Sequence, residues 1–189
     1  MVVYKIILAS NSPRRKELLA GLGMPFEVRV LKDIDESYPE DLPVSEVALH
    51  IAGKKADAYR AIVRDDELII TADTVVIVDD EILGKPVDEA DAVRMLRLLS
   101  GRTHQVTTGV CLLTATQERR FAVTTDVTFK ALSDEEIHYY VTTYKPFDKA
   151  GAYGIQEWIG YIGVTCLHGS YYNVMGLPVQ RIYEAIRTF

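Results

Sequence analysis

The sequence contains one long β run, Leu68 to Val78, in which aliphatic and β-branched residues fill ten of the eleven positions and a single charged residue fills the other. A run of this composition favours a strand. The charge is Asp73, and a carboxylate inside an apolar run is costly to bury unless it is paired, hydrogen-bonded or metal-bound. If the strand ends or bulges at Asp73, the side chain can face a ligand at the strand's carboxyl end. The alternative is that Asp73 is an ordinary turn residue that breaks a hairpin.

The remainder of the chain predicts strands and helices on both sides of this run. Strands are expected at 4–9, 26–30, 104–116, 121–129 and 164–167, helices at 13–22, 44–61, 88–99, 133–143 and from 178 onward, and a loop at 31–43. The two Thr/Val-rich runs at 104–116 and 121–129 are expected to pair as an antiparallel ribbon. The order mixes βα units with antiparallel pairs, which predicts an α/β fold with a mixed twisted sheet flanked by helices. The length suits one domain, residues 1–189, with two lobes around a central cleft.

The segment Ser10–Arg15 places two arginines in the first turn of a predicted helix with Ser12 as its N-cap. A helix N-terminus already carries partial positive charge, so each cation there costs a few tenths of a kcal/mol. A bound anion would offset this cost, because free N–H groups, the hydroxyls of Ser10 and Ser12, and the guanidinium groups of Arg14 and Arg15 all suit phosphate oxygens. The alternative is that one arginine reaches solvent while the other pairs with a carboxylate.

Four further side chains are candidates for a site. Lys85 lies between a glycine and a proline, an unusual place for a solubility residue because proline restricts the residue before it. Lys55 gives a weaker signal, since it follows Lys54 and paired lysines usually form a solvated face. Glu36 in the acidic loop can supply oxygen to a metal, although acids in loops are more often plain solvated charges. Gln156 ends a glycine-rich segment where backbone and amide can approach a planar ligand, or where the glycines only form turns.

Several classes of protein are excluded. The chain has no phosphate-binding P-loop, dinucleotide fingerprint, zinc-protease motif or serine-hydrolase elbow. The net charge of −6 argues against binding to nucleic acid, and no apolar stretch approaches the ~18 residues of a membrane span. The N-terminus shows no signal peptide. Cys111 and Cys166 each lie in an apolar run, so we expect two buried thiols in a reducing compartment and a cytoplasmic protein.

Taken together, the segments resemble the Maf proteins in order and along essentially the whole chain. The matching segments are Leu8–Leu19, Ala72–Val76, Leu83–Pro86, Leu96–His104, Asp148–Gln156 and Tyr171–Pro178. One departure follows Gln156, where Glu157-Trp158-Ile159 replaces the small, glycine-rich residues of the family pattern.

The resemblance implies a nucleoside triphosphate pyrophosphatase, in which NTP and water give NMP and pyrophosphate, with a fold like that of the inosine-triphosphate pyrophosphatases. It implies a divalent metal (Mg²⁺, Mn²⁺ or Co²⁺), a nucleoside triphosphate as the bound partner, and a homodimer. By this resemblance Asp73 is the proton acceptor and, with Glu36, a metal ligand. Phosphate contacts fall on Ser10, Arg15, Lys55 and Lys85. Arg14, Thr74 and Gln156 match the branch that acts on dTTP and UTP. The alternative is a nucleotide-binding regulator of septum formation without significant hydrolysis.

Overall fold

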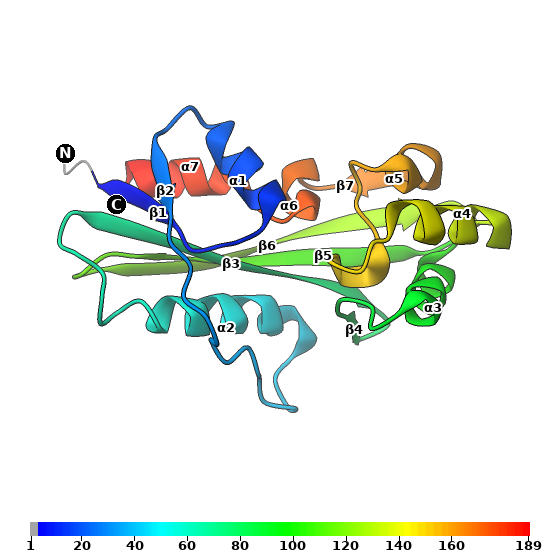
Figure 1. The fold of residues 1–189 in the computed structure, drawn as a ribbon, viewed down its shortest axis with the longest axis horizontal. Helices are drawn as coiled ribbons and strands as arrows, with labels where there is room; N and C mark the ends of the chain where they lie inside the picture. The colour runs from blue at the N-terminus through cyan, green and yellow to red at the C-terminus, as the bar shows by residue number, and fades with distance from the viewer. Residues whose placement is uncertain (1–3) are drawn as a thin grey trace. The chain divides into compact units, whose positions relative to one another are not determined.

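The computed structural model of the chain describes residues 4–189 (Figure 1). Its strands are β1 (Lys5–Leu8), β2 (Phe26–Val28), β3 (Glu67–Val78), β4 (Glu81–Leu83), β5 (Thr103–Leu113), β6 (Glu118–Phe129) and β7 (Val164–His168). Its helices are α1 (Pro13–Ala20), α2 (Val44–Asp57), α3 (Glu89–Leu99), α4 (Asp134–Tyr144), the 3₁₀ turn η1 (Ala150–Ala152), α5 (Trp158–Gly163), α6 (Tyr171–Met175) and α7 (Val179–Arg187).

The strands form one sheet in the order β2-β1-β3-β5-β6-β7, with β4 paired to β3. Strand β1 is parallel to β2 and β3, whereas β4 is antiparallel to β3 and β7 is antiparallel to β6. The side-chain hydroxyls of Thr107 and Thr124 lie 2.9 Å apart, and those of Thr103 and Thr128 lie 2.8 Å apart, as expected for an antiparallel β5–β6 pair. The predicted α/β fold with a mixed sheet is therefore confirmed.

The chain divides into two compact units. The first holds the chain up to Asp73, Thr108–Val123 and Gly176–Phe189, and the second holds Thr74–Thr107 and Thr124–Met175. Strands β3, β5 and β6 each contribute residues to both units. Within β3, the division falls between Asp73 and Thr74.

In the first unit, α1 and α7 lie on one face of the strands and α2 lies on the other (Figure 1). Ile7, Ile69 and Cys111 of the strands pack with Ala56 and Tyr59 in its buried core. Helix α2 contacts β5 at a glycine. A Cβ built on Gly109 would lie 2.5 Å from the carbonyl carbon and oxygen of Ala48, so the close approach requires a residue without a side chain. This contact fixes the position of α2 against the sheet.

In the second unit, α3, α4 and the strands enclose one apolar core that includes Leu96, Phe129 and Tyr140. Helix α4 begins with a capping box. The Ser133 hydroxyl accepts from the Glu136 N–H, and the Glu136 carboxylate accepts from the Ser133 N–H. These two bonds satisfy N–H groups that the helix itself leaves unpaired.

Some expectations were wrong. Asp73 does not end its strand, because β3 continues from Glu67 to Val78. Helix α1 ends at Ala20 rather than at Gly23, which follows in the turn with φ 69°. Cys111 is buried as expected, but Cys166 is exposed, because it lies on β7 at the end of the strand order. Within residues 4–189, no helix is both long enough and apolar enough to cross a bilayer.

Candidate functional site

Helix α1 begins with two ordered serines. The Ser12 hydroxyl accepts a hydrogen bond from the Arg15 N–H at 3.3 Å, as predicted for an N-cap. The hydroxyl of Ser10, a buried residue, accepts from the Ser12 N–H at 3.2 Å. The two hydroxyls therefore satisfy N–H groups of the turn that begins α1, and the positive end of the helix dipole at this turn favours a nearby anion.

Arg15 joins three segments of the first unit. Its Nε donates to the Gly176 carbonyl at 2.8 Å and its Nη1 donates to the Ala72 carbonyl at 2.9 Å. Burial lowers the pKa of Arg15 from its ordinary value, the neighbouring Asp73 raises it, and the positive charge of Arg14 lowers it again. The two guanidinium groups thus repel each other next to a carboxylate, and an added anion would relieve that repulsion.

Asp73 and Glu36 meet at the same ammonium group. Lys55 Nζ lies 2.8 Å from Asp73 Oδ1 and 3.1 Å from Glu36 Oε1. The side chains of Lys55 and Asp73 are only 14% and 16% exposed, whereas that of Glu36 is 57% exposed. The structure therefore brings together three of the predicted site residues from α2, β3 and the loop before α2.

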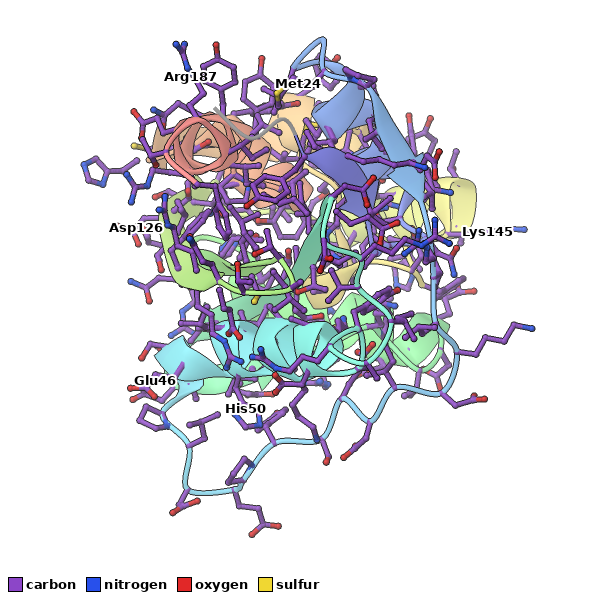
Figure 2. All side chains as sticks on the ribbon, turned by 90° about the vertical axis from the view of Figure 1, so that its left-hand side faces the viewer. Met24, Glu46, His50, Asp126, Lys145 and Arg187 are labelled. Atoms are coloured by element: carbon purple, nitrogen blue, oxygen red, sulfur yellow. The ribbon has the colours of Figure 1, made fainter. Side chains whose placement is uncertain are left out.

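The loop between β2 and α2 also contacts α2 at Lys54, the residue before Lys55. Lys54 Nζ lies 2.6 Å from Asp35 Oδ2 and donates to the Ser37 carbonyl at 2.9 Å. The hydrogen bond from Lys54 is the main cause that holds the pKa of Asp35 well below its ordinary value, with further bonds from Ser37. Figure 2 shows this loop passing along α2, on which Glu46 and His50 are labelled. Consecutive lysines on α2 therefore pair with consecutive acids, which keeps Glu36 near Lys55.

The two carboxylates of Asp73 and Glu36 suit a hard divalent cation whose remaining ligands come from a bound substrate. Within residues 4–189, no three His, Cys, Asp or Glu side chains are grouped so that they could hold a metal by themselves. Asp73 and Glu36 do converge on one cation, Lys55 Nζ. Magnesium is commonly bound by one or two carboxylates together with substrate phosphates and water. The two carboxylates fit that pattern.

Three predicted residues belong to the second unit. Thr74 is half-buried on β3, and Lys85 is exposed in the loop between β4 and α3. That loop is tied to η1, because the Gly84 carbonyl accepts from the Gly151 N–H at 3.0 Å. Gln156 follows η1, and its Oε1 is buried without a hydrogen-bond partner in the described part of the chain. A buried amide oxygen of this kind is an unused acceptor.

Sequence reasoning missed a polar cluster around Gln156. Lys149 Nζ lies 3.1 Å from Glu157 Oε1, and the Tyr140 hydroxyl donates to Glu157 Oε2. The Asp148–Gln156 segment gave a partial signal, since it contains a lysine among turn residues. Tyr140 gave none, because it lies on a helix whose packing the sequence does not show. A shallow pocket elsewhere in the second unit is lined by Asp79, Asp80 and Asp126, whose charges oppose polyphosphate binding.

Known proteins resemble this chain over nearly its whole length. A family model described as "Maf-like protein" matches residues 5–189. This chain belongs to the Maf family. It is 61% identical over 184 residues to a protein from Phocaeicola vulgatus named dTTP/UTP pyrophosphatase, covering 97% of this chain and 95% of that one. It is 58% identical to a protein of the same name from Bacteroides thetaiotaomicron, with the same coverage of both chains.

A solved structure supports the fold of this Maf protein. The Ham1 protein of Staphylococcus aureus matches with a TM-score of 0.51, covering 97% of this chain and 98% of that chain. The sequence identity is 16%, so the likeness concerns the fold. It agrees with the sequence-based expectation of a fold like that of the inosine-triphosphate pyrophosphatases.

Proposed function

We propose that this Maf protein hydrolyses dTTP and UTP to the nucleoside monophosphate and pyrophosphate. The observation that carries the proposal is the 61% identity, over 97% of the chain, to a protein named dTTP/UTP pyrophosphatase. The meeting of Asp73, Lys55 and Glu36 in the first unit supplies groups that the reaction needs. The rival proposal is a regulator that binds the nucleotide without hydrolysing it.

The reaction joins a water oxygen to the α-phosphorus and breaks the bond from that phosphorus to the oxygen bridging the α- and β-phosphates. Asp73 accepts the proton of the attacking water, and pyrophosphate leaves with the bridging oxygen. Lys55 orients the Asp73 carboxylate through the contact of 2.8 Å. An ammonium group has three N–H donors. With two of them directed at Asp73 and Glu36, the third can meet a phosphate oxygen.

The substrate's negative charge is matched by groups at the start of α1. Arg14 and Arg15 supply guanidinium donors, and the positive end of the α1 helix dipole lies in the same turn. Ser10 and Lys85 complete the set of proposed phosphate contacts. A bound Mg²⁺, Mn²⁺ or Co²⁺ would polarise phosphoryl oxygens and stabilise charge on the leaving pyrophosphate. Glu36 and Asp73 would hold it through carboxylate oxygens.

We assign base selection to Gln156 and include Thr74 as a second proposed specificity residue. Uracil and thymine present an acceptor at O4 and a donor at N3, and an amide can pair with both. Cytosine reverses this edge, so an amide held in one orientation discriminates against it. The Oε1 of Gln156, which is buried and has no hydrogen-bond partner among residues 4–189, supports this assignment.

The test is pyrophosphate release from dTTP, UTP, CTP and GTP with and without a chelator. We expect activity on dTTP and UTP that the chelator abolishes. Asp73→Asn should lower turnover by ~10²-fold or more, a loss typical of removing a general base. Asp80→Asn is the matched control, because Asp80 lies in the β3–β4 turn at φ 62°, a conformation that asparagine adopts readily. Binding of dTTP without pyrophosphate release would favour the regulator instead.

The proposal also places the protein in the cytoplasm as a homodimer of single-domain chains. Cell fractionation measures the first property, and sedimentation of the purified protein measures the second.

A further inference from the structure

Three side chains converge over Gly154. A Cβ built at this position would lie 3.1 Å from Gln156 Nε2, from Glu157 Cδ and from Lys149 Cε. Contacts of that length are tighter than most Cβ contacts, so a side chain at residue 154 would require these three neighbours to shift by a few tenths of an ångström. The proposed base-reading amide and the Lys149–Glu157 pair therefore both lie next to the α-carbon of Gly154.

Lys149 is a buried cation inside this cluster. Its side chain is only 10% exposed, and its Nζ lies 2.7 Å from Asp148 Oδ1 and 3.1 Å from Glu157 Oε1. Asp148 is 58% exposed and Glu157 is 21% exposed, so Glu157 is the more sheltered counter-charge. Burying an ammonium group without a counter-charge costs free energy, so a displacement of Glu157 away from Lys149 would destabilise the fold.

Glu157 also fixes the neighbouring helix. Its Oε2 accepts from the hydroxyl of Tyr140, whose ring is fully buried on α4. The same hydroxyl accepts from the Gly154 N–H at 3.0 Å, and the Glu157 N–H donates to the Gly154 carbonyl at 3.0 Å. The N–H group of Gly154 is thus held by Tyr140 and its carbonyl by Glu157, the residue that directly follows Gln156.

We infer that Glu157, together with Lys149 and Tyr140, positions the Gln156 amide and thereby sets the preference for uracil and thymine over cytosine. The inference rests on the proposed function. A freely turning amide could exchange its donor and acceptor and serve either base edge. The loop that carries Gln156 is held by Tyr140 and Glu157 through the backbone of Gly154, and this restraint keeps the donor and acceptor of the amide in fixed positions. Glu157 acts through Gln156 and is a positioning residue.

The experiment measures kcat/KM for UTP and CTP in the wild type and in Glu157→Gln. This change keeps the side chain's size but removes the more sheltered of the two negative charges that face Lys149. We expect the UTP/CTP ratio to fall about tenfold, a loss of about 1.4 kcal/mol of discrimination. A smaller folded fraction would lower both rates equally and leave the ratio unchanged. Glu81→Gln is the control, because Glu81 forms an exposed pair with Arg94 in the same unit.

Two further variants test the route. Tyr140→Phe retains the buried ring and should also lower the ratio, which keeps the inference testable if Glu157→Gln does not fold. In a Gln156→Ala background, Glu157→Gln should change the ratio no further, since coupled residues are not additive. An unchanged UTP/CTP ratio in both Glu157→Gln and Tyr140→Phe, with an active wild type, overturns this inference alone. Absence of UTP hydrolysis in the wild type overturns the proposed function and this inference with it.

Discussion

The stability of the first unit should depend on pH through one buried carboxylate, Glu67. Its side chain is fully buried at the start of β3, and Arg29 contacts both carboxylate oxygens, at 2.5 and 2.8 Å. The hydrogen bonds from Arg29 are the main cause that lowers the pKa of Glu67 from 4.5 to about 2. At about 1.4 kcal/mol per pH unit, this lowering stabilises the folded state by about 3 kcal/mol at neutral pH.

The sign of the effect follows from the direction of the shift. A carboxyl whose pKa is lower in the folded state stabilises the fold above its unfolded pKa, and this contribution is lost as pH falls toward the folded value. With pKa values of 4.5 and about 2, roughly two-thirds of the 3 kcal/mol is lost by pH 3. Glu67→Gln cannot titrate, so its stability should lack this component.

Urea unfolding of the wild type and Glu67→Gln at several pH values between 7 and 3 measures the difference directly. We expect the stability advantage of the wild type to shrink by about 2 kcal/mol over this range. Glu184→Gln is the control, because Glu184 forms an exposed pair with Arg181 in the same unit. A wild-type advantage that stays constant with pH would refute the assignment of the lowered pKa to Glu67.

Two other predictions concern the same unit and the edge strand. Tyr59→Phe should lower the free energy of unfolding by about 1–2 kcal/mol, because the buried hydroxyl donates to the Arg29 carbonyl at 2.7 Å and accepts from the Leu31 N–H at 3.0 Å. Thermal melts of the wild type and the variant measure this loss of stability, and equal melting temperatures would contradict the prediction. A thiol reagent at pH 8 should modify the exposed Cys166 in the folded protein and spare Cys111, because burial raises the pKa of the Cys111 thiol to about 11. Peptide mapping separates the two cysteines, and equal labelling of both would be inconsistent with the fold.

Much of the fold could be predicted from local patterns. The β3 run, the serine cap of α1 and the capping box of α4 each have a signature of a few neighbouring residues, and all three were found. Helices α5 and α6 were missed because they have only six and five residues, too few to show a helical period. The exposure of Cys166 could not be predicted because it depends on the place of β7 in the strand order.

The candidate site was predictable where a local rule is broken. The cations at the start of α1 and the carboxylate within β3 both violate local preferences, and Arg15 does lie close to Asp73. The pairing of Lys55 with Asp73 and Glu36 could not be derived from spacing, since it depends on how α2 packs against β3. The Tyr140–Glu157–Lys149 cluster joins residues from α4, the loop after it and the start of α5, so only the folded chain shows it.

The contact between Gly109 of β5 and α2 restricts which substitutions the chain can accept at residue 109. Any side chain at Gly109 would meet the main chain of Ala48, which cannot turn aside as a flexible side chain can. The only relief is a displacement of the whole helix, and Lys55 lies two turns further along it. A mutation at a position with no chemistry of its own would therefore move the ammonium group away from Asp73. Mutational scanning should find residue 109 as intolerant of change as the proposed site residues Lys55 and Asp73.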